Sequence, residues 1–115
     1  MKRICQAALS MMLGLCLSPS QAQTYPDKPV RLVVPYAPGG PTDIIARLFS
    51  EKLADLWKQP VLVDNRAGAS GNVGSAQVAK AAPDGDTVLI NTSSVAVNAS
   101  LYTNAGYNLD KDLRS

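Results

Sequence analysis

Three short apolar runs divide the sequence that follows residue 22. They occupy residues 30–34, 61–63 and 87–90, and β-branched residues dominate them. A nearly continuous apolar run of this length is typical of a strand that is covered on both faces, as in a parallel sheet. The pattern therefore predicts three buried parallel strands.

Helical periodicity fills the intervals between these runs. Apolar side chains recur at steps of three and four residues up to Pro60, with charged residues between them. These apolar positions are Ile45, Leu48, Phe49, Leu53 and Leu56. Further helices are predicted at residues 73–80 and 93–101, and Phe49 and Trp57 are expected in the core. Alternating strands and helices with short links predict an α/β fold, a parallel sheet with flanking helices.

Residues 1–22 have the pattern of a cleavable signal peptide. A basic start precedes a mostly apolar run at residues 4–17, and small residues at −3 and −1 predict cleavage after Ala22. The alternative is a membrane anchor, but the run is shorter than the ~20 residues that span a bilayer. Cleavage implies export to the periplasm and a mature chain of residues 23–115.

Composition narrows the function classes. Both cysteines, Cys5 and Cys16, lie in the leader, so the mature chain has no disulfide and no thiol nucleophile. Removal of Lys2 and Arg3 lowers the 11 basic residues to 9, which balances the 9 acidic ones. No basic cluster with interleaved aromatic residues remains, so nucleic-acid binding is not expected. The absence of histidine excludes histidine-based catalysis and histidine metal ligands within this sequence.

All three predicted strands lead into small, polar segments, at residues 36–43, 67–72 and 91–94. Ligands of open α/β sheets bind beyond the carboxyl ends of the strands. Glycines allow the backbone to approach a ligand, and the first N–H groups of a helix attract negative charge. The segments therefore predict a site for a small carboxylate. Tyr36 is the aromatic residue expected near the ligand, and hydroxyl donors are expected from Thr42, Ser70, Thr92, Ser93 and Ser94.

Two charged residues near these segments have alternative roles. Asp43 follows Pro41 at a predicted helix start, where its carboxylate either caps the Gly40 N–H or contacts a ligand or bound water. The helix-start pattern favours capping. Arg66 either pairs with Asp64 or contacts the ligand, and the short spacing favours pairing.

The glycine spacing does not fit a nucleotide site. Gly68, Gly71 and Gly74 match neither the dinucleotide fingerprint nor the P-loop, and Ser70 has no histidine base. No cofactor, metal site or catalytic residue is therefore predicted. Two alternatives stay open: a fragment of an exported α/β enzyme whose catalytic residues lie beyond Ser115, and an interaction module without a ligand.

The same segments resemble a known family. Residues 33–47 are similar to the opening motif of the Bug family, the periplasmic substrate-binding components of tripartite tricarboxylate transporters, and residues 63–74 and 83–87 resemble its second and third motifs. Asp86 departs from the aromatic residue usual at its position. The resemblance implies a type II periplasmic-binding-protein fold with two lobes, in which residues 23–115 form the N-terminal part of the first lobe.

The resemblance also implies ligand-binding residues and partners. By motif position, the ligand-binding residues are Ala37, Pro38, Gly39, Gly40, Thr42, Asp43, Ser70, Gly71 and Asn72, with Thr92, Ser93 and Ser94 lining the same cleft. The implied partners are a small carboxylate and the membrane permease subunits of the transporter, and the receptor is expected to be a monomer. Because family members are longer, the chain is expected to be a fragment that is not competent alone.

Overall fold

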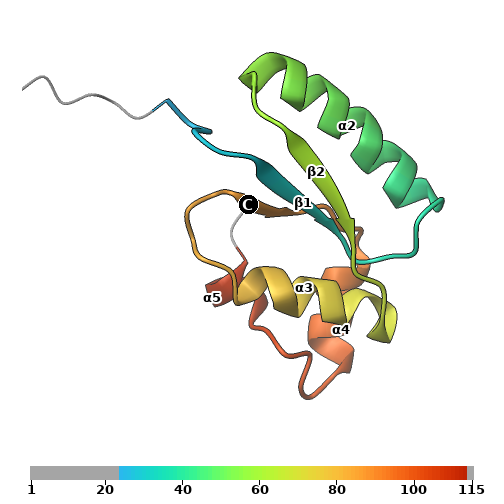
Figure 1. Cartoon of the computed structure of the whole chain (residues 1–115). Coiled ribbons are helices and arrows are strands. Elements are labelled where there is room, and N and C mark those ends of the chain that lie inside the picture. Colours follow the sequence, from blue (N-terminus) through green and yellow to red (C-terminus); the bar gives the residue numbers. More distant parts are fainter. Residues whose placement is uncertain (1–23, 114–115) are drawn as a thin grey trace, which may run out of the picture.

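The computed structural model describes residues 24–113, and the predicted signal peptide lies outside them. Three strands, Val30–Val34 (β1), Val61–Asn65 (β2) and Thr87–Leu89 (β3), form a parallel sheet in the order β2-β1-β3 (Figure 1). The central strand β1 is buried except at Arg31. The predicted parallel sheet is confirmed; β2 ends two residues later, and β3 one residue earlier, than expected.

Helices cover both faces of this sheet. They are α2 (Pro41–Trp57), the short 3-10 turn η1 (Ala69–Gly71), α3 (Asn72–Ala79), α4 (Ser94–Leu101) and α5 (Leu109–Asp112). Figure 1 shows α2 on one side of the sheet and α3 on the other. The connection through α2 leads from β1 to the outer strand β2, and the connection through α3 leads from β2 back past β1 to β3. Because these connections run in opposite directions, right-handed crossovers place the two helices on opposite faces.

The prediction that the large apolar side chains of α2 face the core is confirmed for Leu53 and Trp57 and was wrong for the other four. Ile45, Leu48, Phe49 and Leu56 are 48%, 59%, 54% and 74% exposed, whereas Ala46 is fully buried. The helix instead packs on the sheet through Ala46 together with the partly buried Leu53, Ala54 and Trp57. Small side chains at the contact allow the helix axis to approach the strands closely, and this arrangement turns the large residues outward.

The prediction that all three strands are covered on both faces holds only for β1. Leu62 in β2 is 59% exposed and Val88 in β3 is 38% exposed. Both strands are edges of the sheet within residues 24–113, so each has a strand neighbour on one side only. The core accordingly centres on β1, where Val30, Leu32 and Val34 are buried.

The segment before β1 is tied to the turn before β3. The Tyr25 hydroxyl donates to the Gly85 carbonyl at 2.6 Å, and its ring meets Trp57 edge-on with centroids 6.0 Å apart. Lys28 pairs with Asp86 at 2.6 Å. This hydrogen bond, the largest contribution, raises the pKa of Lys28 above its ordinary value. Asp86, the departure from the family motif, therefore holds the turn through an ion pair.

Candidate ligand-binding site

The three predicted ligand-binding segments begin at the same edge of the sheet. The Arg66 N–H, just after β2, donates to the Val34 carbonyl at 2.7 Å, and the Ile90 N–H, just after β3, donates to the Val33 carbonyl at 3.0 Å. Both outer strands therefore stay paired with β1 up to its carboxyl end. Because of this pairing, the loops that follow the strands start side by side.

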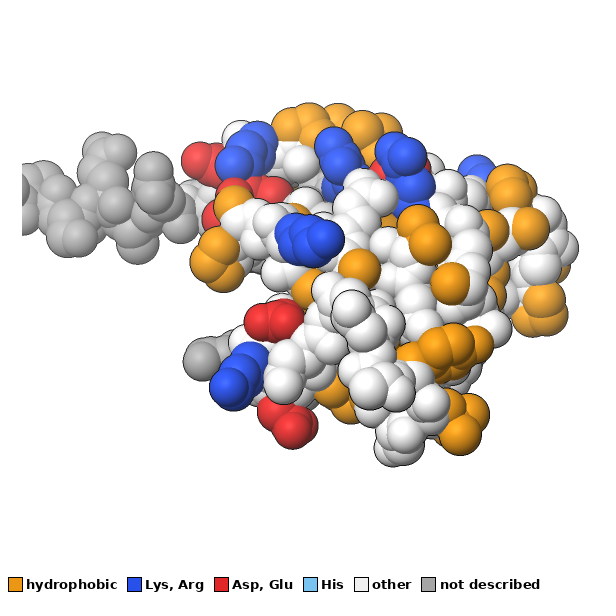
Figure 2. Space-filling view, turned by 90° about the horizontal axis from the view of Figure 1, so that it is seen from below, with side chains coloured by type: hydrophobic (Ala, Val, Ile, Leu, Met, Phe, Trp, Pro, Cys, Tyr) orange, Lys and Arg blue, Asp and Glu red, His pale blue; other side chains and the backbone are white. Residues whose placement is uncertain are grey.

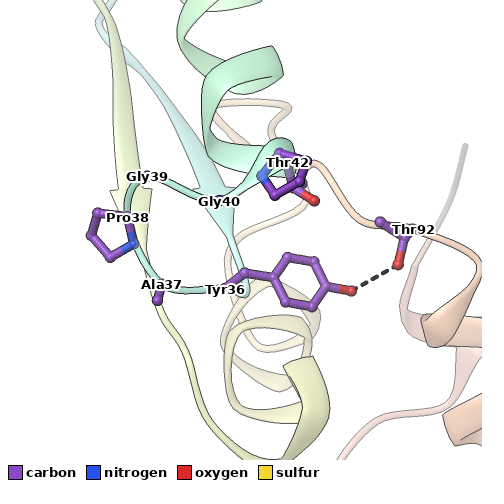
Figure 3. Close-up of a pocket in the computed structure, with 8 residues that line it drawn as sticks. Tyr36, Ala37, Pro38, Gly39, Gly40, Thr42 and Thr92 are labelled. Carbon is purple, nitrogen blue, oxygen red and sulfur yellow. Dashed lines mark hydrogen bonds between the residues drawn. The ribbon is translucent and has the colours of Figure 1, made fainter.

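An open cavity of about 560 Å³ lies at this edge, beside the loop between β1 and α2 (Figure 3). Its lining residues are Tyr36, Ala37, Pro38, Gly39, Gly40, Pro41, Thr42 and Thr92. Seven of these eight were predicted from the sequence as ligand-binding residues, and Pro41 is the addition. The first and third segments thus meet in one cavity.

The buried carboxylate of Asp43 accepts hydrogen bonds that order the loop beside this cavity. The residue is only 2% exposed. Its Oδ2 accepts from the Gly39 N–H and the Arg47 Nε–H, both at 2.9 Å, and its Oδ1 accepts from Asn65 Nδ2 at 2.9 Å. The Arg47 hydrogen bond, then those from Gly39 and Asn65, lower the pKa of Asp43 to about 2. The predicted cap on the Gly40 N–H is not found, because the carboxylate accepts instead from the Gly39 N–H, one residue before the N-cap of the helix.

This hydrogen-bond pattern leaves backbone donors free at the start of α2. Among residues 24–113, neither the Gly40 N–H nor the Thr42 N–H has a hydrogen-bond acceptor, and Pro41 between them has no N–H. Gly39 turns the chain into the helix with a φ of +84°, and no atom lies within 4 Å of the position of an added Cβ. The loop therefore presents two amide donors at the positive end of a 17-residue helix.

Tyr36 links the first segment to the third. Its hydroxyl contacts Asn91 Oδ1 at 2.7 Å, Thr92 Oγ1 at 2.9 Å, and the Ser94 hydroxyl. Asn91 in turn donates from Nδ2 to Ser75 Oγ at 3.0 Å. Sequence reasoning missed Asn91 and Ser75. The signal for Asn91 was its place directly after a strand, whereas nothing in the sequence points to Ser75.

The second segment supports Tyr36 but does not line the cavity. Gly71 and Asn72 are buried, and an added Cβ at Gly71 would lie 3.6 Å from the Tyr36 ring. Ser70 is exposed with a φ of 55°, and its carbonyl accepts from Asn98 Nδ2 at 2.8 Å. For Ser70, Gly71 and Asn72, ligand contact therefore stays a prediction, and the same holds for the exposed Ser93.

Arg66 pairs with Asp64, as the sequence favoured. Its Nε donates to the two carboxylate oxygens of Asp64 at 2.9 and 3.0 Å. Within the described part of the chain, no three His, Cys, Asp or Glu side chains gather where they would hold a metal ion. No helix there is long and apolar enough to cross a membrane.

A parallel sheet whose strand exits form an open cavity with free amide donors is the architecture of a ligand-binding lobe. Residues 45–115 match the tripartite tricarboxylate transporter family receptor, and the chain belongs to this family. It is 45% identical to protein BugT of Bordetella pertussis over 84% of this chain and 30% of the relative. A protein of Pseudomonas sp. strain P51 is 43% identical over 87% of this chain and 31% of its own length.

Solved structures of similar proteins have the same fold. The periplasmic binding protein BugD is 44% identical, with a TM-score of 0.70 over 73% of this chain and 28% of that one. MatC from Rhodopseudomonas palustris with bound malate is 38% identical, with a TM-score of 0.71 over 76% and 30%. R. palustris Rpa4515 with adipate is 37% identical, with a TM-score of 0.65 over 73% and 28%.

These findings confirm the predicted family and fold class. The matched relatives belong to a family of solute-binding receptors and not of enzymes. The chain spans about 30% of the length of the curated relatives that it matches. The sheet and its flanking helices correspond to part of one α/β lobe of a periplasmic binding protein.

Proposed function

We propose that this chain supplies the carboxylate-binding loop of a periplasmic receptor that serves a tripartite transporter. The single observation that carries the proposal is the pair of free donors, the Gly40 and Thr42 N–H groups, beside a cavity at the strand exits. Malate and adipate, named for two similar structures, both carry carboxylates. Membership of a receptor family supports binding, with no chemical step, as the activity.

The carboxylate would be held mainly by the backbone. Its oxygens accept from Gly40 and Thr42, where the α2 dipole favours negative charge by ~0.3–1 kcal/mol. Each hydrogen bond to a charged group adds ~1.5–3 kcal/mol. The nearby Asp43 does not repel the ligand strongly, because Arg47 pairs with it at 2.9 Å. Asp43 therefore orders the loop, and it is the amide groups that contact the ligand.

Export and delivery complete the proposal. The leader at residues 1–22 would direct the chain to the periplasm and be cut after Ala22, as suits relatives that are periplasmic binding proteins. The transport partners would be the membrane permease subunits, and the receptor would act as a monomer. The alternative, a fragment of an exported α/β enzyme, has no support from the relatives.

The proposal is tested by NMR titration of mature residues 23–115 with L-malate. We expect saturable shifts of the Gly40 and Thr42 amide signals at millimolar ligand, since a Kd of 1 mM corresponds to only about 4 kcal/mol. Succinamide, which has no charge, serves as the control ligand and should leave these signals in place. Saturable shifts confined to other parts of the chain would contradict the proposal.

A matched pair of variants at one position sharpens the test. In Gly40→Asp, the new carboxylate accepts from the free N–H groups of α2 and repels the ligand, so malate affinity should fall at least ~10-fold while the helix gains a preferred N-cap residue. In Gly40→Ala, the nearest atom to the added Cβ is the Ala37 carbonyl oxygen at 3.6 Å. This neutral variant should bind malate like the wild type.

A further inference from the structure

We propose that the cavity selects carboxylates that also carry a hydrogen-bond donor, a hydroxyl or an ammonium group, near the carboxylate. This inference rests on the proposed function and adds the substrate class. Its basis is the direction of the hydrogen bonds at the Thr92 end of the cavity. Every hydroxyl hydrogen there is donated within the protein, so the side chains at that end present only acceptors to a ligand.

The direction is set first by Ser75, which is fully buried. The Gly71 carbonyl can only accept, so the Ser75 hydroxyl donates its single hydrogen to it at 2.8 Å. Ser75 Oγ therefore accepts from Asn91 Nδ2 at 3.0 Å. The Thr92 N–H donates to Asn91 Oδ1 at 2.7 Å. These two contacts independently fix the orientation of the Asn91 amide, because reversing it would place a donor against a donor at the Thr92 N–H.

The fixed amide then determines the direction at Tyr36. Asn91 Oδ1 carries no hydrogen, so the Tyr36 hydroxyl donates to it at 2.7 Å and has no second hydrogen to give. The single hydroxyl hydrogen of Thr92 goes either to Ser94 Oγ at 3.1 Å or to the Tyr36 oxygen at 2.9 Å, both inside the protein. The Ser94 hydroxyl donates to the Tyr36 oxygen. All three hydroxyl hydrogens of this cluster are thereby used inside the protein.

The cavity is consequently polarised. Tyr36 and Thr92 line one end and present oxygen lone pairs, whereas Gly40 and Thr42 at the helix start present amide hydrogens. Figure 3 shows the Tyr36 ring reaching from the loop toward Thr92, with Gly40 and Thr42 along the same opening. A carboxylate alone satisfies only the amide end. A neighbouring hydroxyl or ammonium group supplies the hydrogen that the acceptor end lacks.

L-malate and succinate test the acceptor end of the cavity separately from the amide end, because they have the same charge and differ in one hydroxyl group. NMR titration of residues 23–115 should give a Kd for L-malate about 10-fold below that for succinate. This ratio is smaller than the ratios of fully enclosed sites because water reaches this open cavity. Signals of Tyr36 and Thr92 should shift with malate more than with succinate.

Two variants that each delete one hydroxyl group complete the experiment. Thr92→Val keeps the shape of the side chain but removes its acceptor, and the malate-to-succinate ratio should fall toward one. Ser100→Ala removes an exposed hydroxyl group of α4 whose partner is the Ala96 carbonyl, and it should keep the wild-type ratio.

The possible failures are distinguishable. Equal wild-type affinities for both acids, with saturable shifts at Gly40 and Thr42, would overturn this inference and leave the proposed function standing. The absence of saturable binding of either acid at the cavity would overturn both. An unchanged ratio in Thr92→Val would also overturn the inference, since the selectivity would then arise elsewhere.

Discussion

The hydrogen bonds of Asp43 determine which backbone N–H groups stay free in the loop between β1 and α2. A carboxylate at the start of a helix usually satisfies the free N–H groups of that helix. Here it reaches back to Gly39 and sideways to Arg47 and Asn65. Among residues 24–113, the N–H groups of Gly40 and Thr42 are left without an acceptor. The same residue type at the same position would close the site if its side chain turned toward the helix.

At the same residue, the low pKa predicts a pH-dependent contribution to stability. The pKa falls from 3.8 to about 2, so the stabilisation is fully present above 3.8 and is lost as the pH drops through about 2. Asp43→Asn should therefore lower the free energy of unfolding at neutral pH, and the difference from the wild type should vanish in strong acid. Urea unfolding at several pH values measures this difference.

Asp55→Asn provides the control for this pH series. Asp55 is exposed on the same helix, so its substitution should change stability little at any pH. A constant difference between the wild type and Asp43→Asn from neutral pH down to pH 2 would contradict the assigned hydrogen bonds.

Among the elements, α3 lies unusually close to the end of β1. A Cβ added at Gly74 would lie 2.8 Å from the Pro35 Cβ, 2.9 Å from its Cα and 3.0 Å from the Arg66 carbonyl oxygen. Two of these atoms belong to the backbone and cannot move aside cheaply. Glycine at this position therefore allows the helix start to sit against the exits of β1 and β2.

Gly74→Ala tests this close approach. Overpacking costs ~1–3 kcal/mol, and the better helix propensity of alanine offsets about 1 kcal/mol of it. We expect a net loss of up to about 2 kcal/mol in the free energy of unfolding, measured by urea denaturation. Gly40→Ala, whose added Cβ would meet the Ala37 carbonyl oxygen at an ordinary contact distance of 3.6 Å, is the matched control and should be near neutral. A gain in stability from Gly74→Ala would show that α3 does not pack this closely.

Most elements could be predicted from the sequence, but the buried face of α2 could not. Periodicity counts large apolar residues, and it selected the side that carries Leu48 and Phe49. The face that packs on the sheet mixes the apolar Leu53 and Trp57 with small or locally paired residues. Among the latter, Ala46 is fully buried and the Ser50 hydroxyl donates to the Val61 carbonyl at 2.6 Å. Such a mixed face has a weaker hydrophobic signal than the side that carries Leu48 and Phe49.

The candidate site also contains some residues that could be predicted from the sequence and others that could not. The loop at residues 36–42 and Thr92 could be predicted because small residues after a strand have a local reason to be there. Asn91 and Ser75 could not be assigned a role, because their contact depends on how α3 crosses the sheet. The order of strands brings them together, and no spacing along the chain encodes that order.

For the whole molecule, many large apolar side chains are exposed because the buried core is small. The buried cluster consists of Val30, Leu32, Val34, Ala46 and Val61. Hydrophobic side chains gather in patches on the surface seen in Figure 2, and the exposed large residues include five of α2. A substitution on the outer, exposed face of α2 should therefore change the free energy of unfolding little. The same substitution on the inner face, which packs on the sheet, should lower it.

Introducing one glutamate on each face of α2 decides this point. Leu48 is 59% exposed, so Leu48→Glu should change the free energy of unfolding by no more than about 0.5 kcal/mol. Ala46 is fully buried, and Ala46→Glu forces a charge and extra volume against β1, which should cost several kcal/mol or prevent folding. Urea denaturation followed through Trp57 fluorescence compares the two variants. Similar losses in both would mean that another element covers the outer face of α2, and the packing described for this lobe would then be wrong.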